Sequence, residues 1–264
     1  MNSIPLKILN SIAFVIMITV NFLANVLPLG IGSTGDVSEK YPNLFTPAPV
    51  TFIVWGLIYL LLLVFVLYQW GLLDGRKNSD AIVKRIGIWF VVSCCLNTGW
   101  IFAWHFDVIW MSLLCMLGLL FSLIMITNRL NSEKVSSSGK LGSCIGFEIY
   151  FGWIIAATIA NVSVFLTWLN WDRFGLSEVF WMVVVLCVGA GIASVLAFVK
   201  HRRAAALAVV WAYIGILIRH ISPDHYDGKY SRVIAVAAIC IFLIIVFIFV
   251  DIIRDPFRKK CRTK

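Results

Sequence analysis

Long apolar blocks separated by short polar connections divide this chain, and no other feature limits its fold as strongly. We count eight such blocks of about 15–26 residues, and about 20 residues of helix cross the hydrocarbon core of a membrane. We therefore predict an all-α polytopic membrane protein with eight transmembrane helices. The predicted spans run near Ile8–Pro28, Val50–Trp70, Ile86–His105, Val108–Thr127, Leu141–Leu166, Val179–Val199, Ala204–Ile218 and Val233–Val250.

The composition excludes the other broad classes of protein. Hydrophobic residues make up 61% of the chain and charged residues only 13%, whereas about a quarter of an ordinary soluble domain is charged. A soluble domain of this size has too little interior to cover so much apolar surface, and a disordered chain would be more polar. The apolar residues form continuous blocks and do not alternate, which excludes a β-barrel.

The basic residues predict an orientation. The N-terminus, the even-numbered connections and the C-terminal tail hold 17 Lys and Arg, and the other side holds five. Because cytoplasmic loops are enriched in Lys and Arg, we expect both termini in the cytoplasm and the protein in the plasma membrane. The net charge of +9 is spread over these short loops and the tail, so we expect contact with membrane lipid and no nucleic-acid partner.

Polar and aromatic residues share helical faces inside the predicted spans. In Leu141–Leu166, one stripe holds Tyr150, Trp153, Ala157 and Asn161, and an adjacent stripe of small residues allows close helix packing. In Ile86–His105, Asn97 and Trp100 lie one turn apart. Trp55 with Tyr59, and Asn21 with Asn25, form similar pairs in the first two spans.

These residues have structural as well as functional interpretations. Most of the 11 Trp lie near span ends, where interfacial anchoring explains them. Asn97 and Asn161 fit an interhelical hydrogen bond as well as a ligand contact, and Glu148 fits a structural carboxylate as well as a functional one. We expect the seven Cys to be buried apolar residues. We expect His220 and His225, with Asp224 and Asp227, to lie in a solvated external loop, with a metal-binding cluster as the alternative. We identify no catalytic motif and no metal site.

Three segments resemble the TspO/MBR family, the tryptophan-rich sensory proteins related to the translocator protein. LNTGWIFAWHF (Leu96–Phe106) and IYFGWIIAATIAN (Ile149–Asn161) are similar to its Leu-Asn-x-x-Trp-x-x-x-Phe-Phe and Pro-Tyr-x-x-Trp-x-x-x-Ala-x-x-x-Asn signatures. FTPAPVTFIVWGLIY (Phe45–Tyr59) is similar to its proline-rich entry followed by Trp-x-x-x-Tyr. The resemblance covers residues 8–166.

The resemblance implies a five-helix bundle over residues 1–166, with a ligand pocket beneath the first loop. Residues 167–250 would then form a three-helix extension, and 251–264 a basic cytoplasmic tail. The extension either covers the bundle or forms the interface of a homodimer. The implied pocket residues are Trp55, Tyr59, Asn97, Trp100, Tyr150, Trp153, Ala157 and Asn161, with Asn21, Asn25, Pro47 and Pro49 at its lid or edge.

Family members bind porphyrins, haem-like tetrapyrroles, sterols or synthetic aromatic compounds. We therefore expect a sensory or binding protein for a planar hydrophobic ligand such as a porphyrin, with no obligatory cofactor. The alternative is a secondary transporter or permease for a small hydrophobic solute, in which Glu148 would couple transport to protons. Enzymatic degradation of a tetrapyrrole is implied by the resemblance alone, and we expect no enzyme.

Overall fold

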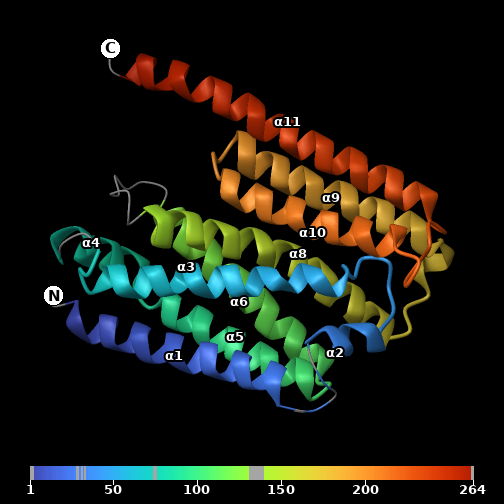
Figure 1. The fold of residues 1–264 in the computed structure, drawn as a ribbon, viewed down its shortest axis with the longest axis horizontal. Coiled ribbons are helices and arrows are strands. Elements are labelled where there is room, and N and C mark those ends of the chain that lie inside the picture. Colours follow the sequence, from blue (N-terminus) through green and yellow to red (C-terminus); the bar gives the residue numbers. More distant parts are fainter. Residues whose placement is uncertain are drawn as a thin grey trace. The chain divides into compact units, whose positions relative to one another are not determined.

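The computed structural model describes residues 3–27, 30, 32, 34–73, 76–130 and 140–262, apart from the side chains of 76–78, 140 and 255–262. Within these ranges the chain forms helices and no strand (Figure 1). Pro28, the predicted end of the first span, and most side chains of the predicted tail lie outside the described residues. The α-helices are α1 (Ile4–Val26), α2 (Thr34–Lys40), α3 (Val54–Gln69), α4 (Arg76–Ile86), α5 (Trp89–His105), α6 (Ile109–Leu130), α8 (Gly146–Trp168), α9 (Glu178–Phe198), α10 (Arg203–Ile221) and α11 (Ser231–Arg262).

Seven of the described helices are long and apolar enough to cross a membrane, and a bent pair brings the number to eight. The bent pair is α4 and α5, whose axes differ by 59° across a short break. Gly87, in the left-handed region at φ +62°, ends α4 there, and glycine adopts this conformation without steric cost. The predicted third span, Ile86–His105, therefore begins later, at Trp89, and the basic residues before it lie on a separate helix. The prediction of a helical, multi-pass membrane protein is confirmed.

The chain divides into two compact units. The first holds residues 1–43 and 52–170, and the second holds 44–51 and 171–264. Leu44–Thr51, which lies within the bundle expected over residues 1–166, belongs to the second unit. We call this segment, which contains Pro47 and Pro49, the strap.

The first unit contains α1 to α8. The chain turns tightly between α5 and α6, where Asp107 has a φ of 65°. At the other end of these helices, three phenylalanine rings from α3, α5 and α8 meet edge to face: the centroid of Phe65 lies 5.0 Å from Phe90 and 5.1 Å from Phe147. All three side chains are fully buried, so this cluster fixes the three helices against one another.

A polar cluster attaches α1 to α3 and α4. The Lys7 ammonium lies 2.5 Å from a carboxylate oxygen of Asp80, and the amide of Asn10 donates to Gln69 Oε1 at 3.0 Å. Lys7, Asn10 and Gln69 are buried. Because Asp80 compensates the charge of Lys7, α1 extends four residues further toward the N-terminus than the predicted start at Ile8.

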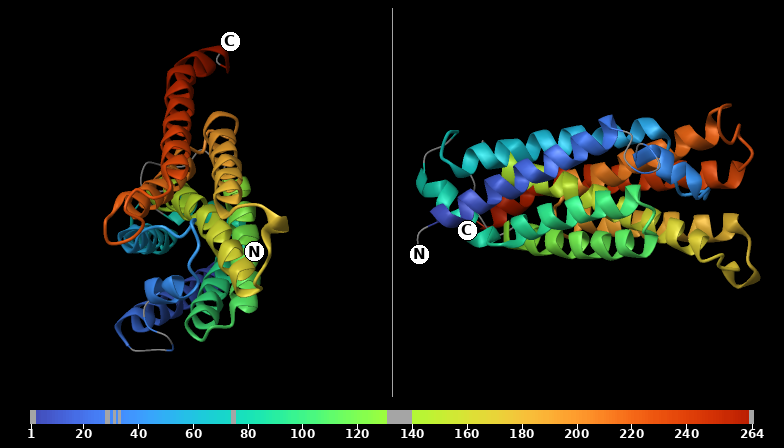
Figure 2. Two further views of the ribbon diagram at one scale, coloured as in Figure 1. Left: turned by 90° about the vertical axis from the view of Figure 1, so that its right-hand side faces the viewer. Right: turned by 90° about the horizontal axis from the view of Figure 1, so that it is seen from below.

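The second unit consists of α9, α10 and α11, which run side by side (Figures 1 and 2), together with the strap. The strap follows α10 closely: Ala48 N–H donates to the Gly215 carbonyl at 3.0 Å, and the Trp211 indole donates to the Thr51 carbonyl at 2.9 Å. A Cβ at Gly215 would lie 1.9 Å from Thr51 Oγ1. Only glycine at position 215 therefore allows the strap this close.

Side-chain pairs extend two helices of the second unit beyond their predicted ends. Arg219, expected to stop the seventh span at Ile218, is buried with its guanidinium 5.6 Å from the Tyr226 ring centre. Asp251, expected to begin a basic tail, is buried in α11 and accepts from Arg203 Nε at 2.6 Å. The carboxylate and the guanidinium satisfy each other, and the backbone stays helical to Arg262.

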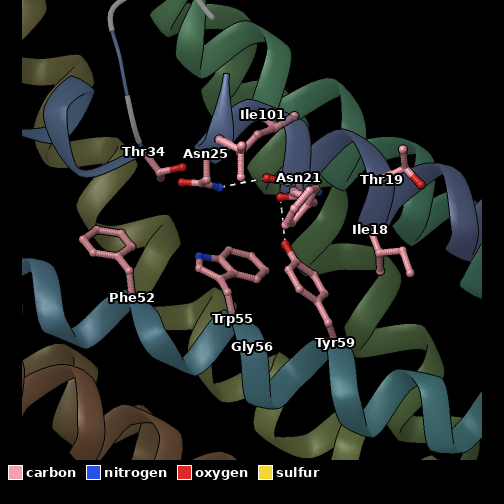
Figure 3. A pocket seen from close by; sticks show the side chains of 12 residues that line it. Ile18, Thr19, Asn21, Asn25, Thr34, Phe52, Trp55, Gly56, Tyr59 and Ile101 are labelled. Carbon is pink, nitrogen blue, oxygen red and sulfur yellow. Dashed lines mark hydrogen bonds between the residues drawn. The ribbon is translucent and has the colours of Figure 1, made fainter. Parts of the chain in front are cut away.

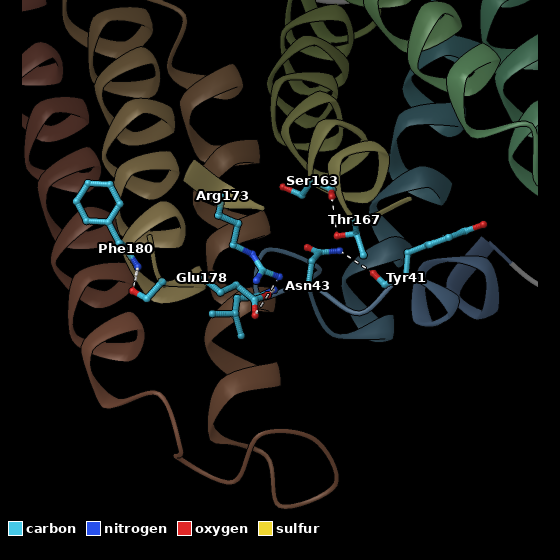
Figure 4. A network of polar contacts seen from close by, with 9 residues as sticks. Tyr41, Asn43, Ser163, Thr167, Arg173, Glu178 and Phe180 are labelled. Atoms are coloured by element: carbon cyan, nitrogen blue, oxygen red, sulfur yellow. Dashed lines mark hydrogen bonds and ion pairs between the residues drawn. The ribbon is translucent and has the colours of Figure 1, made fainter. Parts of the chain in front are cut away.

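Polar contacts lie at the end of α8 in the first unit and at the start of α9 in the second unit (Figure 4). In the second unit, the Ser177 hydroxyl accepts from Phe180 N–H at 3.2 Å and caps α9. Glu178 accepts from the Leu44 N–H at 3.2 Å and lies 3.9 Å from the Arg173 guanidinium. Glu178 therefore joins the start of α9 to the strap.

Candidate ligand-binding site

A pocket of about 630 Å³ lies in the first unit between α1 and α3. The C-terminal half of α1 forms one wall, and the first turns of α3 with Phe52 just before them form the other; α2 and α5 each contribute one residue (Figure 3). Pockets of about 300–1,000 Å³ accommodate small organic ligands. The described residues that line it are Ile18, Thr19, Asn21, Phe22, Asn25, Val26, Thr34, Phe52, Trp55, Gly56, Tyr59 and Ile101.

Aromatic side chains from the α3 side face asparagines from α1. Phe52, Trp55 and Tyr59 follow one another at intervals of three and four residues, so they share one face and point into the pocket (Figure 3). Gly56 lies on the same wall, and a Cβ there would meet no atom within 4 Å. The missing side chain of Gly56 therefore keeps open space beside the Trp55 ring.

A chain of hydrogen bonds holds the amide wall in place. The Tyr59 hydroxyl donates to Asn21 Oδ1 at 2.7 Å, Asn21 Nδ2 donates to Asn97 Oδ1 at 2.7 Å, and Asn97 Nδ2 donates to the Tyr150 hydroxyl at 3.0 Å. These four side chains come from α3, α1, α5 and α8. Asn25 Nδ2 extends the chain by donating to the Asn21 carbonyl at 2.8 Å. The polar groups beside the pocket are therefore fixed in orientation by four helices.

Trp55 separates the pocket from a cluster of buried aromatic rings. Its ring centre lies 5.7 Å from Trp100 in a stacked arrangement, and 5.9 Å and 6.1 Å from Tyr150 and Trp153 in edge-to-face arrangements. Trp100, Tyr150 and Trp153 are buried, whereas Trp55 is partly exposed. Edge-to-face and offset stacking are the favoured geometries of aromatic pairs, so the cluster holds the Trp55 ring in position.

Asn161 anchors the far side of this cluster. Its Oδ1 accepts from the Trp100 indole at 3.3 Å and from the Ser112 hydroxyl at 2.9 Å, and its Nδ2 donates to the Ala157 carbonyl at 3.1 Å. Within the described residues, the buried indole nitrogen of Trp153 has no hydrogen-bond partner. A buried donor without a partner is costly, and this one lies directly behind Trp55.

The short helix α2 covers one end of the pocket and is fixed to α5. The Trp104 indole donates to the Thr34 carbonyl at 3.1 Å, and Thr34 Oγ1 lies 3.3 Å from His105 Nε2. At the other end of α2, Lys40 and the Tyr41 hydroxyl both donate to Asp107. The hydrogen bond between Lys40 and Asp107 raises the pKa of the Lys40 ammonium. Gly30, at φ +63°, allows the approach, because a Cβ there would lie 2.0 Å from the His105 carbonyl oxygen.

A family model described as TSPO-like protein matches residues 7–250. The chain belongs to the TSPO-like family. No curated protein and no solved structure matches the chain. The family match confirms the resemblance found over residues 8–166 and extends it through α9 and α10 to residue 250, near the end of the apolar part of α11.

In this TSPO-like protein, four of the predicted site residues line the pocket: Asn21, Asn25, Trp55 and Tyr59. Asn97, Trp100, Tyr150, Trp153 and Asn161 lie behind them and form the hydrogen-bonded and aromatic support described above. Ala157 contributes its carbonyl to Asn161. Pro47 and Pro49 belong to the strap of the second unit and are not among the residues that line the pocket.

The other residues that line the TSPO-like pocket are not predicted from the sequence. Phe22 and Val26 extend the stripe of Ile18 and Asn25 along α1, but they read as ordinary lipid-facing residues. Gly56 reads as a helix residue without a role, and only the structure shows the space beside it. Thr34 is contributed by α2, whose position depends on Trp104 and His105.

Four further residues of the TSPO-like chain that the sequence singles out lie outside the pocket lining. Glu148, the basis of the transporter alternative, lies in the first turn of α8, is partly exposed and does not line the pocket. His220, expected in a solvated loop, is fully buried in α10: its Nδ1 lies 2.9 Å from the Ile216 carbonyl, and its ring packs 4.8 Å from Tyr226. Cys95 and Cys187, expected to be buried, are exposed.

Proposed function

We propose that this protein is a membrane-embedded binding and sensory protein for a planar hydrophobic ligand, with a porphyrin or another tetrapyrrole as the candidate class. One observation carries the proposal: the Trp55 ring faces the amides of Asn21 and Asn25 across a pocket of about 630 Å³ (Figure 3). A flat conjugated ring system would stack on the indole, and its polar edge would meet the amides.

The proposed site is preorganised, which supports a role in binding. Asn21 is held by Tyr59 and Asn97, and Trp55 by Trp100 and the rings behind it. Side chains that are already ordered lose little conformational entropy when a ligand binds. The proposal is of binding without turnover, so a bound tetrapyrrole should be recovered with its absorption spectrum unchanged.

Filling the pocket tests the proposal. Gly56→Phe places a ring in the pocket, and its Cβ meets no atom within 4 Å. The matched control is Gly191→Phe on α9, where a Cβ also meets no atom within 4 Å. Protoporphyrin IX and its dimethyl ester would each be titrated into purified protein in lipid nanodiscs while tryptophan fluorescence is followed.

We expect saturable quenching by at least one of the two porphyrins in the wild type and in Gly191→Phe, and its loss in Gly56→Phe. Equal quenching in both variants would show that the porphyrin binds elsewhere or only partitions into lipid. Absence of saturable quenching by either compound in the wild type would overturn the proposed function.

We also propose that both termini face the cytoplasm and that the protein resides in the plasma membrane. The asymmetry of Lys and Arg supports this orientation. At one end of the first unit, Lys84 and Arg85 of α4 are exposed, and Arg129 of α6 donates to the Arg85 carbonyl at 3.3 Å. Among the described residues of the first unit, the end covered by α2 carries mainly carboxylates: Asp36, Glu39 and Asp107, with one ammonium, that of Lys40.

A further inference from the structure

The lining of the pocket carries no formal charge. Of the described residues that line it, none is Lys, Arg, His, Asp or Glu, and its polar groups are amides, hydroxyls and the Trp55 indole N–H. Among the contacts described above, one basic side chain reaches the lining: His105, which contacts Thr34. An ionised carboxylate that leaves water must be paired or hydrogen-bonded, because its desolvation is costly.

Most donors of the amide wall are already committed to the protein. Asn21 Nδ2 donates to both the Met17 carbonyl and Asn97 Oδ1, at 2.9 and 2.7 Å, and the Tyr59 hydroxyl donates to Asn21 Oδ1. Asn25 Nδ2 donates to the Asn21 carbonyl, which turns the amide oxygen of Asn25 toward Thr34 (Figure 3). Of the described groups, one N–H of Asn25 and the Trp55 indole N–H remain for a ligand, and these neutral donors cannot neutralise the charge of a carboxylate.

Among the described residues of the first unit, the surroundings of the pocket offer no compensating cation. The end covered by α2 has three described carboxylates and one described ammonium group. That ammonium, of Lys40, is bound to Asp107. On the α1 side, the lining residues Phe22 and Val26 are 66% and 61% exposed, so the rim there is apolar. A ligand carboxylate would meet negative charge at one edge and hydrocarbon at the other.

We infer that the pocket selects an uncharged planar ligand and discriminates against ligands that carry ionised carboxylates. The inference rests on the proposed function and narrows its ligand class: among tetrapyrroles, the pocket takes neutral or esterified forms in preference to free dicarboxylic acids. Hydrogen-bond donors on the ligand, O–H or N–H, suit the Asn25 amide oxygen.

The two porphyrins named above form a matched pair for the test, because they share one ring and differ in the two carboxyl groups. Binding would be measured at pH 8, where histidine side chains are generally uncharged. The signal of Gly56→Phe would be subtracted for each compound to remove partitioning into lipid. We expect the dimethyl ester to bind at least about tenfold more tightly than the diacid.

A charge placed in the pocket should reverse this preference. Asn25→Lys introduces an ammonium at the wall, and we expect it to raise the affinity for the diacid at least about tenfold and to weaken binding of the ester. Asn128→Lys on an exposed part of α6 adds the same charge away from the pocket and should change neither. Thermal unfolding of each variant identifies any that fail to fold, and the wild-type comparison of the two porphyrins does not depend on them.

Two outcomes would overturn the inference and can be told apart. If the diacid binds the wild type as tightly as the ester, and Gly56→Phe abolishes its binding, the charge argument is wrong and the proposed function stands. If neither compound binds saturably, the proposed function fails and the inference fails with it.

Discussion

The side-chain amides of Asn21 and Asn97 meet at 2.7 Å between α1 and α5, and this contact joins the wall of the pocket to the core of the first unit. Both residues are buried. Asn21 receives a hydrogen bond from Tyr59, and Asn97 passes one on to Tyr150. A ligand that disturbs Asn21 therefore disturbs side chains on three other helices, which is a physical route from binding to a change in the bundle.

The first prediction is an energetic coupling between these two amides. A double-mutant cycle with Asn21→Ala and Asn97→Ala should give a coupling energy of about 0.6 kcal/mol, and at most about 1.7 kcal/mol, as found for interhelical hydrogen bonds in membranes. The measurement is the free energy of unfolding in mixed micelles. Strictly additive effects of the two substitutions would mean that the amides do not support each other.

The second prediction concerns Trp55. Trp55→Ala should weaken binding of the preferred porphyrin at least roughly tenfold, about 1.4 kcal/mol, because the indole is the largest apolar surface of the lining. Trp153→Ala should weaken binding less, since Trp153 acts through the Trp55 ring 6.1 Å away. Trp171→Ala, in the second unit, controls for loss of an indole and should stay within a factor of about two. A larger effect of Trp171→Ala than of Trp55→Ala would contradict this assignment.

The third prediction concerns the strap. Gly215→Ala should destabilise the protein by about 1–3 kcal/mol, the usual cost of overpacking, because the new methyl group would lie 1.9 Å from Thr51 Oγ1. Removing that oxygen with Thr51→Ala should restore part of the loss. Gly191→Ala, which meets no atom within 4 Å, should be neutral or stabilising by up to about 1 kcal/mol. Equal melting temperatures for Gly215→Ala and Gly191→Ala would show that the strap does not lie against α10.

The fourth prediction concerns topology. In a background without the native cysteines, Asp224→Cys in the exposed connection after α10 should react with a membrane-impermeant maleimide in intact cells. Lys200→Cys, in the exposed connection before α10, should react only after permeabilisation. The reverse pattern would contradict the proposed orientation. Labelling of both sites in intact cells would show that α10 does not cross the membrane.

The sequence alone predicts the helical membrane fold and many of the residues at the site. Hydrophobic blocks mark the spans because helix length and membrane thickness impose the same constraint on every such protein. The helical spacing of Tyr150, Trp153 and Asn161 places them on one face, and the structure shows that face supporting the pocket from behind.

The remaining features depend on contacts that no local pattern records. The strap belongs to the second unit because the Gly215 carbonyl and the Trp211 indole, far along the chain, satisfy its backbone. The break before α5 depends on the conformation of Gly87. The open space at Gly56 and the donor-poor amide wall depend on how α1 faces α3, and a pattern within either helix contains no information about that pairing.

The strap also sets an order of events during biosynthesis. Thr51 and the Trp211 indole that binds its carbonyl are 160 residues apart, and a ribosome adds about 5–20 residues per second. For roughly 8–30 s the nascent chain therefore contains the strap but not yet α10, to which the strap binds. Phe45, Ala48 and Thr51, which are buried in the finished protein, lack their contacts with Tyr213 and Gly215 until α10 has been made. A chain that stopped after α8 would lack these contacts permanently.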